Sequence, residues 1–140
     1  MPLGLRRNTK VDLLSKVPLF ASLSKGQLGQ VATIADELDL RAGKVLIREG
    51  ERGREFFVLL EGEVDVRRKG RKVATGHKGE FIGEIALVSN VPRVATVTAI
   101  TPVRVLVIRS QDFRTLLRSY PDIALKVLVT VADRLSNVDF

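Results

Sequence analysis

Hydrophobic and polar positions divide the chain into a helical beginning, a long central part of short strands, and a helical end. After a short helical turn within residues 9–20, residues 24–27 (SKGQ) have the S-x-x-Q form of a capping box. Apolar residues behind it recur at one helical face, namely Leu28, Val31, Ala32, Ala35 and Leu38. This spacing predicts a helix from Lys25 to about Glu37.

From residue 38 to residue 108 the pattern changes to short apolar runs separated by glycines. Residues 63–67 (EVDVR) alternate with a period of two, which predicts a strand with Val64 and Val66 facing inward. Residues 55–60 (EFFVLL) are apolar on both faces, as expected of a central strand. Short strands with such frequent turn signals predict an antiparallel β-roll or jelly-roll barrel, mainly β with flanking helices.

Helical patterning returns after Ile108. Ser110 is expected to be the N-cap of a helix over residues 111–119, whose apolar side chains would face inward. These side chains are Phe113, Leu116 and Leu117. Pro121 suits the first turn of another helix, which is expected to run to about residue 137.

This last helix is apolar over more than one face. Four of its residues follow a 3-4-3 spacing like that of a coiled-coil seam, and they are Leu128, Val131, Leu135 and Val138. Two interpretations stay open. The helix packs against the barrel and frays at its end, or its second face contacts a partner, which would be an effector or the second copy in a homodimer.

Composition narrows the class of protein. The 140 residues suit one domain, and no window is long and apolar enough to predict a membrane helix. The N-terminus does not resemble a signal peptide, and the absence of cysteine fits a cytoplasmic location. The net charge of +7 is densest in residues 67–72 (RRKGRK), which look like a hairpin tip. Because aromatic residues are only 5% of the chain, this charge favours a solvated surface over a nucleic-acid site.

Catalytic or metal-binding constellations are not evident. The only histidine is His77, in a Gly-His-Lys-Gly turn, where a solvated loop side chain is expected rather than a metal ligand. There is no cysteine nucleophile and no G-x-S-x-G motif. The sequence therefore predicts neither an enzyme nor a cofactor for these residues.

A ligand site is indicated where charges interrupt the apolar segment 81–99 (FIGEIALVSNVPRVATVTA). Gly83 permits close approach of backbone to a ligand, and the turn after it is expected to present free N–H groups to an anion. Arg93 has a planar fork that matches two phosphate oxygens, and Glu84 suits a neighbouring sugar hydroxyl. The alternative is an internal ion pair between Glu84 and Arg93, because neither charge is tolerated alone in an apolar setting.

Segment 81–99 also resembles the phosphate-binding cassette of cyclic-nucleotide-binding domains, with the pattern F-G-E-[LI]-[AS]-L followed by P-R-[ATSV]-A-[TS]-V. The matching residues are Phe81-Ile82-Gly83-Glu84-Ile85-Ala86-Leu87 and Pro92-Arg93-Val94-Ala95-Thr96-Val97, with Ile82 as one inserted residue. The resemblance extends over about residues 11–137. It implies a helical lead-in (1–37), a β-roll that holds the cassette (38–109), and C-terminal hinge and lid helices (110–140).

By this resemblance, Arg93 pairs with the cyclic phosphate, aided by the backbone N–H groups of Ala86 and Val94. Glu84 accepts the ribose 2′-hydroxyl, and the backbone of Gly83 lies beside the sugar. Ile85 and Pro92 complete the cassette part of the expected site.

The resemblance also suggests which nucleobase the expected ligand carries. Members that favour cyclic GMP often carry Thr or Ser directly after the arginine, whereas Val94 has no hydroxyl, which favours cyclic AMP. Val73 is expected to support the base. The implied function is a sensor whose ligand moves the C-terminal helices and so signals to an effector. Two alternatives remain: a non-binding scaffold for protein partners, and the regulatory part of a DNA-binding regulator.

Overall fold

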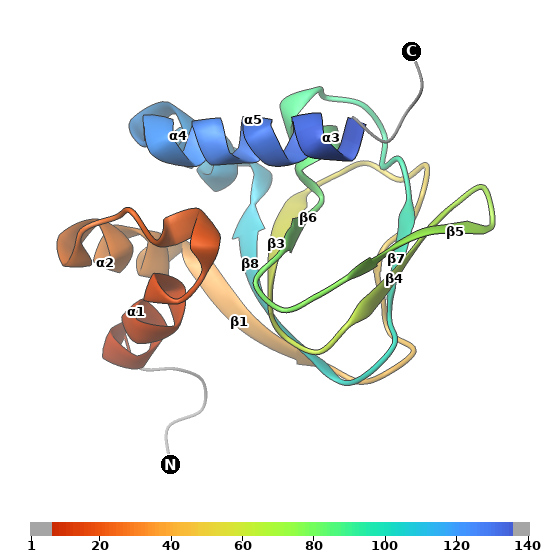
Figure 1. The fold of residues 1–140 in the computed structure, drawn as a ribbon, viewed down its shortest axis with the longest axis horizontal. Coiled ribbons are helices and arrows are strands. Elements are labelled where there is room, and N and C mark those ends of the chain that lie inside the picture. Colours follow the sequence, from red (N-terminus) through yellow and green to blue (C-terminus); the bar gives the residue numbers. More distant parts are fainter. Residues whose placement is uncertain (1–6, 136–140) are drawn as a thin grey trace.

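The computed structural model describes residues 7–135, and Figure 1 shows their arrangement. Helices at both ends of the chain lie on one side of a β-roll, whose two sheets make up the rest of the molecule. The elements in chain order are α1 (Arg7–Ser15), η1 (Pro18–Phe20), α2 (Lys25–Ile34), β1 (Ala35–Leu40), β2 (Val45–Ile47), β3 (Glu55–Glu61), β4 (Val64–Arg68), β5 (Arg71–Gly76), β6 (Phe81–Ile82), α3 (Glu84–Val88), β7 (Thr96–Ala99), β8 (Val103–Arg109), α4 (Ser110–Ser119) and α5 (Pro121–Leu135).

The predicted antiparallel β-roll is confirmed, but it is not a closed barrel. One four-stranded sheet has the order β1-β8-β3-β6 and the other the order β2-β7-β4-β5, and every pairing is antiparallel. Strands β4 and β5 form a hairpin that turns at Lys69 and Gly70, both with positive φ. This conformation suits the right-handed twist of the strands. The turn lies within residues 67–72, where the sequence predicted a hairpin tip.

The first sheet separates two hydrophobic cores. Along β3, Phe56, Val58 and Leu60 belong to a core shared with the helices, whereas Phe57 and Leu59 belong to a core between the two sheets. A strand with period-two side chains must be apolar on both faces to serve two cores. This accounts for the EFFVLL run and confirms β3 as a central strand.

The N-terminal part begins as predicted and ends earlier. Ser24 and Gln27 form the capping box of α2, with reciprocal hydrogen bonds of 3.2 and 2.9 Å. The predicted continuation to Glu37 is wrong, because residues 35–40 pair along their whole length with β8. Tertiary pairing overrides helical spacing here. The ammonium of Lys10 bonds the carbonyls of Ala32 and Ala35, which satisfies groups at the helix end.

The C-terminal helices pack on the first core. Phe113 stacks on Phe56 with ring centroids 4.2 Å apart, and it is fully buried as predicted, together with the largely buried Leu116. The N-cap of α4 is Arg109 rather than Ser110, because the extended chain of β8 continues to Arg109 and the Ser110 N–H donates to the carbonyl of Arg54.

The predicted seam on α5 is only partly within the described residues. Leu128 is 63% exposed, whereas Val131 packs against the first core, so these two residues do not share one exposed stripe. Val138 and the side chain of Leu135 lie outside the described residues. No helix in residues 7–135 is long and apolar enough to cross a membrane.

Candidate functional site

The backbone around Gly83 forms the centre of the candidate site. Strand β6 ends at Ile82, Gly83 takes φ 92°, and α3 starts at Glu84. Such a φ lies in the left-handed region that glycine reaches without strain. A side chain at Gly83 would also approach the Arg93 guanidinium to 2.8 Å. The glycine therefore permits both the turn and the close packing of Arg93.

Arg93 is buried, and its guanidinium bonds main-chain oxygens instead of a carboxylate. Nη1 donates to the carbonyl of Gly83 at 2.9 Å, and Nη2 donates to the carbonyl of Glu55 at 2.6 Å. The main chain of Arg93 is fixed as well, by bonds of 2.8 Å to Gly50 and to Glu51. These four contacts hold the fork in one orientation.

The environment leaves the positive charge of Arg93 without a directly paired anion. Burial lowers the pKa of Arg93, and the charges of Glu55 and Glu84 partly oppose that effect. Among the described residues, the ion pairs do not include Arg93. Since a guanidinium remains protonated in proteins, the site holds a desolvated cation. An anion placed against its remaining N–H groups would be stabilised strongly.

Gly53 completes the packing around this cation. A Cβ atom there would lie 2.7 Å from the Cβ of Ala86 and 3.2 Å from Cζ and Nε of Arg93. Real Cβ atoms do not approach this closely, so only glycine fits between the two residues. The loop before β3 thus lies directly against the cassette.

Glu84 has a different partner from the one considered in the sequence. It is 1% exposed, and its carboxylate forms an ion pair with Nη1 of Arg134, near the end of α5. Nη2 of Arg134 also donates to the carbonyl of Phe81 at 2.7 Å, and the guanidinium lies 5.2 Å from the centre of the Phe81 ring. The internal Glu84–Arg93 ion pair is therefore replaced by a Glu84–Arg134 pair, and Arg93 stays available.

A second arginine holds the other end of α3. Nε and Nη2 of Arg114, from α4, both donate to the carbonyl of Leu87 at 3.3 Å. The two C-terminal helices are thus bonded to the two ends of the same short helix, α4 at Leu87 and α5 at Glu84. A movement of α3 would therefore shift or break contacts with both α4 and α5.

The other predicted site residues lie around this centre. Ala86 is buried and faces Gly53, and Ile85 is half-buried in α3. Pro92 is exposed in the segment before Arg93, and Val94 is half-buried just after it. Val73 lies on β5 with 58% of its surface exposed, and within residues 7–135 no hydrogen bond or ion pair joins it to the cassette. Its contact with a base stays a prediction.

Arg134 is one residue of the candidate site that the sequence interpretation missed. A signal for it was present: Ile123 and Val127 are buried and Val131 is partly buried, and Arg134 continues this stripe three positions further on. A cation on the inner face of an amphipathic helix needs a partner. Gly53 and the carbonyl of Glu55 were also missed, because main-chain acceptors and close packing leave no trace in residue type.

His77 is exposed, as expected, and its Nδ1 lies 2.9 Å from the carboxylate of Glu63. Within the described part of the chain, no group of three or more His, Cys, Asp or Glu side chains is placed to hold a metal ion. The arrangement at Arg93 and Glu84 offers donors for one anionic group and, nearby, an acceptor for a hydroxyl. It is suited to binding and contains no recognisable nucleophile–base pair.

Known proteins resemble this chain over much of its length. A family model described as "Cyclic nucleotide-binding domain" matches residues 37–120. A cyclic nucleotide-gated potassium channel from Rhizobium etli is 38% identical over 123 residues, which cover 88% of this chain and 34% of the channel. The chain spans about a third or less of the length of the curated relatives it matches first.

Solved structures share the fold. A structure described as "cAMP bound PfPKA-R" superposes with a TM-score of 0.82 at 28% identity, covering 94% of this chain and 47% of that one. A second structure is of a Trypanosoma brucei regulatory subunit of a cAMP-independent protein kinase A that carries three substitutions and is bound to cAMP in its A site. It has a TM-score of 0.72 at 25% identity, over 89% of this chain and 51% of that chain.

Proposed function

This chain belongs to the cyclic nucleotide-binding domain family, and we propose that it binds cyclic AMP and relays binding through its C-terminal helices. The observation that carries this proposal is the buried guanidinium of Arg93, which is oriented by the carbonyls of Gly83 and Glu55 and has no carboxylate in contact within residues 7–135. A cyclic phosphate supplies the missing anion. The Glu84 carboxylate, at the start of the adjacent α3, supplies an acceptor for a ribose hydroxyl.

The choice of cyclic AMP rests on two features. Val94 has no hydroxyl to offer a guanine amino group, and one such hydrogen bond is worth about 1 kcal/mol. The T. brucei variant that binds cAMP gained an alanine, an arginine seven positions later, and an alanine directly after the arginine. Ala86 and Arg93 have the same spacing here, but Val94 corresponds by spacing to the valine that the variant lost. The likeness to the cAMP-binding variant thus covers the alanine and the arginine alone.

The relay passes through the Glu84–Arg134 pair. Arg134 donates to one oxygen of the Glu84 carboxylate, and within residues 7–135 no hydrogen bond to the other oxygen is seen, so that oxygen can accept from a ribose hydroxyl. A ligand that fixes α3 would therefore stabilise the docked position of α5. By thermodynamic linkage, docking of α5 would strengthen ligand binding by the same factor. The effector that responds to α5 would be a domain or a protein that contacts this helix.

Calorimetric titration with cyclic AMP and cyclic GMP tests the proposal. We expect binding of cyclic AMP that weakens by about 2 kcal/mol or more in Arg93→Ala, because a charge-assisted bidentate contact is worth that much. Arg93→Lys is the matched control, which retains the charge but loses the planar fork, and it should bind more weakly than wild type. Melting curves of both variants verify folding. No heat with either nucleotide, with an unchanged melting temperature at millimolar ligand, would refute the proposal.

A second candidate function is that of a docking scaffold. The outer face of α5 exposes Leu125 (59%), Leu128 (63%) and Val129 (51%), which form a contiguous apolar strip on this helix. Such strips often mark protein interfaces. A scaffold would keep its partner without nucleotide, so partner binding that is insensitive to cyclic AMP would favour this function over the sensor.

A further inference from the structure

A strongly basic surface lies beside Arg93, at the tip of the β4–β5 hairpin. The N–H of Lys69 donates to the carboxylate of Glu49 at 2.9 Å, which joins the hairpin tip to the turn that follows β2. Four exposed cations of this surface have side chains without a hydrogen bond or ion pair in the part of the chain that the structure describes. We call them the basic rim, and they are Arg52, Arg68, Lys69 and Arg71.

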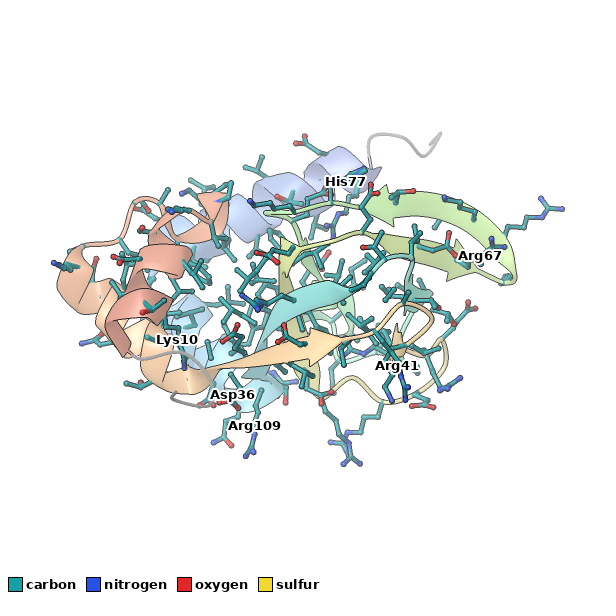
Figure 2. The ribbon with its side chains drawn as sticks, turned by 90° about the horizontal axis from the view of Figure 1, so that it is seen from below. Lys10, Asp36, Arg41, Arg67, His77 and Arg109 are labelled. Carbon is teal, nitrogen blue, oxygen red and sulfur yellow. The ribbon has the colours of Figure 1, made fainter. Side chains whose placement is uncertain are left out.

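The same turn is bonded to the candidate site. The Gly50 N–H donates to the carbonyl of Arg93, and the Arg93 N–H donates to the carbonyl of Glu51, each at 2.8 Å. The Glu49 N–H donates to the hydroxyl of Thr96 at 3.0 Å. Lys69, and with it the hairpin tip, is therefore connected to the main chain of Arg93 by a continuous set of hydrogen bonds. Figure 1 places the β4–β5 hairpin away from the N-terminal helices, and Figure 2 shows Arg67 far from Lys10.

Like charges that face each other destabilise this hairpin. In the strand register Arg68 lies opposite Arg71, and Arg67 lies opposite Lys72. Asp65 compensates the second pair through contacts of 2.6 Å to Arg67 and 3.5 Å to Lys72. Among the described residues, no carboxylate pairs with Arg68 or Arg71, and like charges directly opposite each other destabilise a sheet. A structural role for these cations is therefore a poor explanation.

We propose that the basic rim steers the anionic nucleotide toward Arg93, so that it raises the association rate without contacting the bound ligand. This inference rests on the proposed function. A cluster of unpaired cations around a site raises the local concentration of an anionic ligand and its rate of capture. Steering requires only that the cations be solvated, unpaired and close to the site, and the structure meets these conditions.

Stopped-flow binding of a fluorescent cyclic AMP analogue tests the inference with the triple variant Arg68→Gln/Lys69→Gln/Arg71→Gln. At about 0.01 M salt the Debye length is about 30 Å, and loss of three charges should lower the association rate constant about three-fold. At about 1 M salt, where the Debye length is about 3 Å, the difference should vanish. The dissociation rate constant should not change, and the melting temperature should stay the same or rise.

The matched control removes three exposed cations from the opposite end of the molecule. The variant Lys16→Gln/Lys25→Gln/Arg118→Gln has the same net charge as the rim variant and leaves the hairpin intact. Its association rate should lie near that of wild type. Equal association rates for the two triple variants at low salt, or a change confined to dissociation, would overturn the steering role alone. Failure of wild type to bind at all would overturn the proposed function as well.

Discussion

Arg134 offers the sharpest test of how the C-terminal helix is attached. Its guanidinium pairs with Glu84, donates to the carbonyl of Phe81, and lies over the Phe81 ring. The substitution Arg134→Met keeps an unbranched apolar side chain but removes the charge and every donor. The carboxylate of Glu84, 1% exposed, would then be buried without a cation in contact.

The expected magnitude follows from the exposure of the two partners. Removing one partner of a fully buried ion pair costs about 3–5 kcal/mol. Here the side chain of Arg134 is 38% exposed, so water screens the pair from one side. We therefore expect Arg134→Met to lower the free energy of unfolding by about 2–3 kcal/mol at neutral pH.

Urea unfolding measures this change, and two further variants isolate its cause. Adding Glu84→Gln to Arg134→Met should recover most of the loss, because an amide is cheaper to bury than an unpaired carboxylate. Lys126→Met removes another cation of α5, whose ammonium donates to the carbonyl of Pro18 at 2.8 Å, and should cost only about 1 kcal/mol. The reasoning is refuted if Arg134→Met costs no more than Lys126→Met, or if the double variant is no more stable than Arg134→Met.

Three further predictions concern packing, pH and ligand choice. Gly53→Ala should destabilise the fold by about 1–3 kcal/mol and weaken cyclic AMP binding, whereas Gly26→Ala, with open space around it, should stabilise by about 0.4–1 kcal/mol; equal melting shifts would contradict this. The hydrogen bond from Arg67 holds the pKa of Asp65 below its ordinary value, so Asp65 stabilises the fold at neutral pH and this contribution is lost as the pH falls through the lowered pKa. Asp65→Asn should therefore lower the melting temperature at pH 7 but not in strong acid, and a pH-independent difference would argue against the pair. Val94→Thr should bring cyclic GMP affinity about five-fold closer to that of cyclic AMP in calorimetry, and an unchanged ratio would remove the hydroxyl argument.

Local signals predicted most elements of the fold. The S-x-x-Q capping box, the period-two run at residues 63–67 and the two-faced run at 55–60 all correspond to the structure. The helix end at Ile34 could not be predicted in this way, because residues 35–40 become a strand only by pairing with β8, more than sixty positions later in the chain. Closure is likewise a long-range property, and the two sheets stay separate.

The residues of the candidate site likewise divide into those that local sequence indicated and those that depend on long-range packing. Gly83, Glu84 and Arg93 stand close together in one segment, so residue types and spacing indicated them. Arg134 comes from another element, and its role depends on how α5 packs. The sequence left open whether Glu84 pairs with Arg93 or with a distant residue. A buried charge requires a partner, but this requirement does not specify which residue the partner is.

The first sheet, with a separate core on each face, has a consequence for how the domain moves. Among the described residues, α4 and α5 contribute to the core on the helix side of this sheet, whereas β2, β7 and β4 contribute to the core between the two sheets. A displacement of the helices therefore disturbs one set of apolar contacts and leaves the contacts between the sheets in place. In hydrogen exchange, the helical layer should open as its own cooperative unit, at lower free energy than the strands behind it. Under the relay proposed above, ligand binding can therefore move α4 and α5 while the two sheets keep their mutual packing.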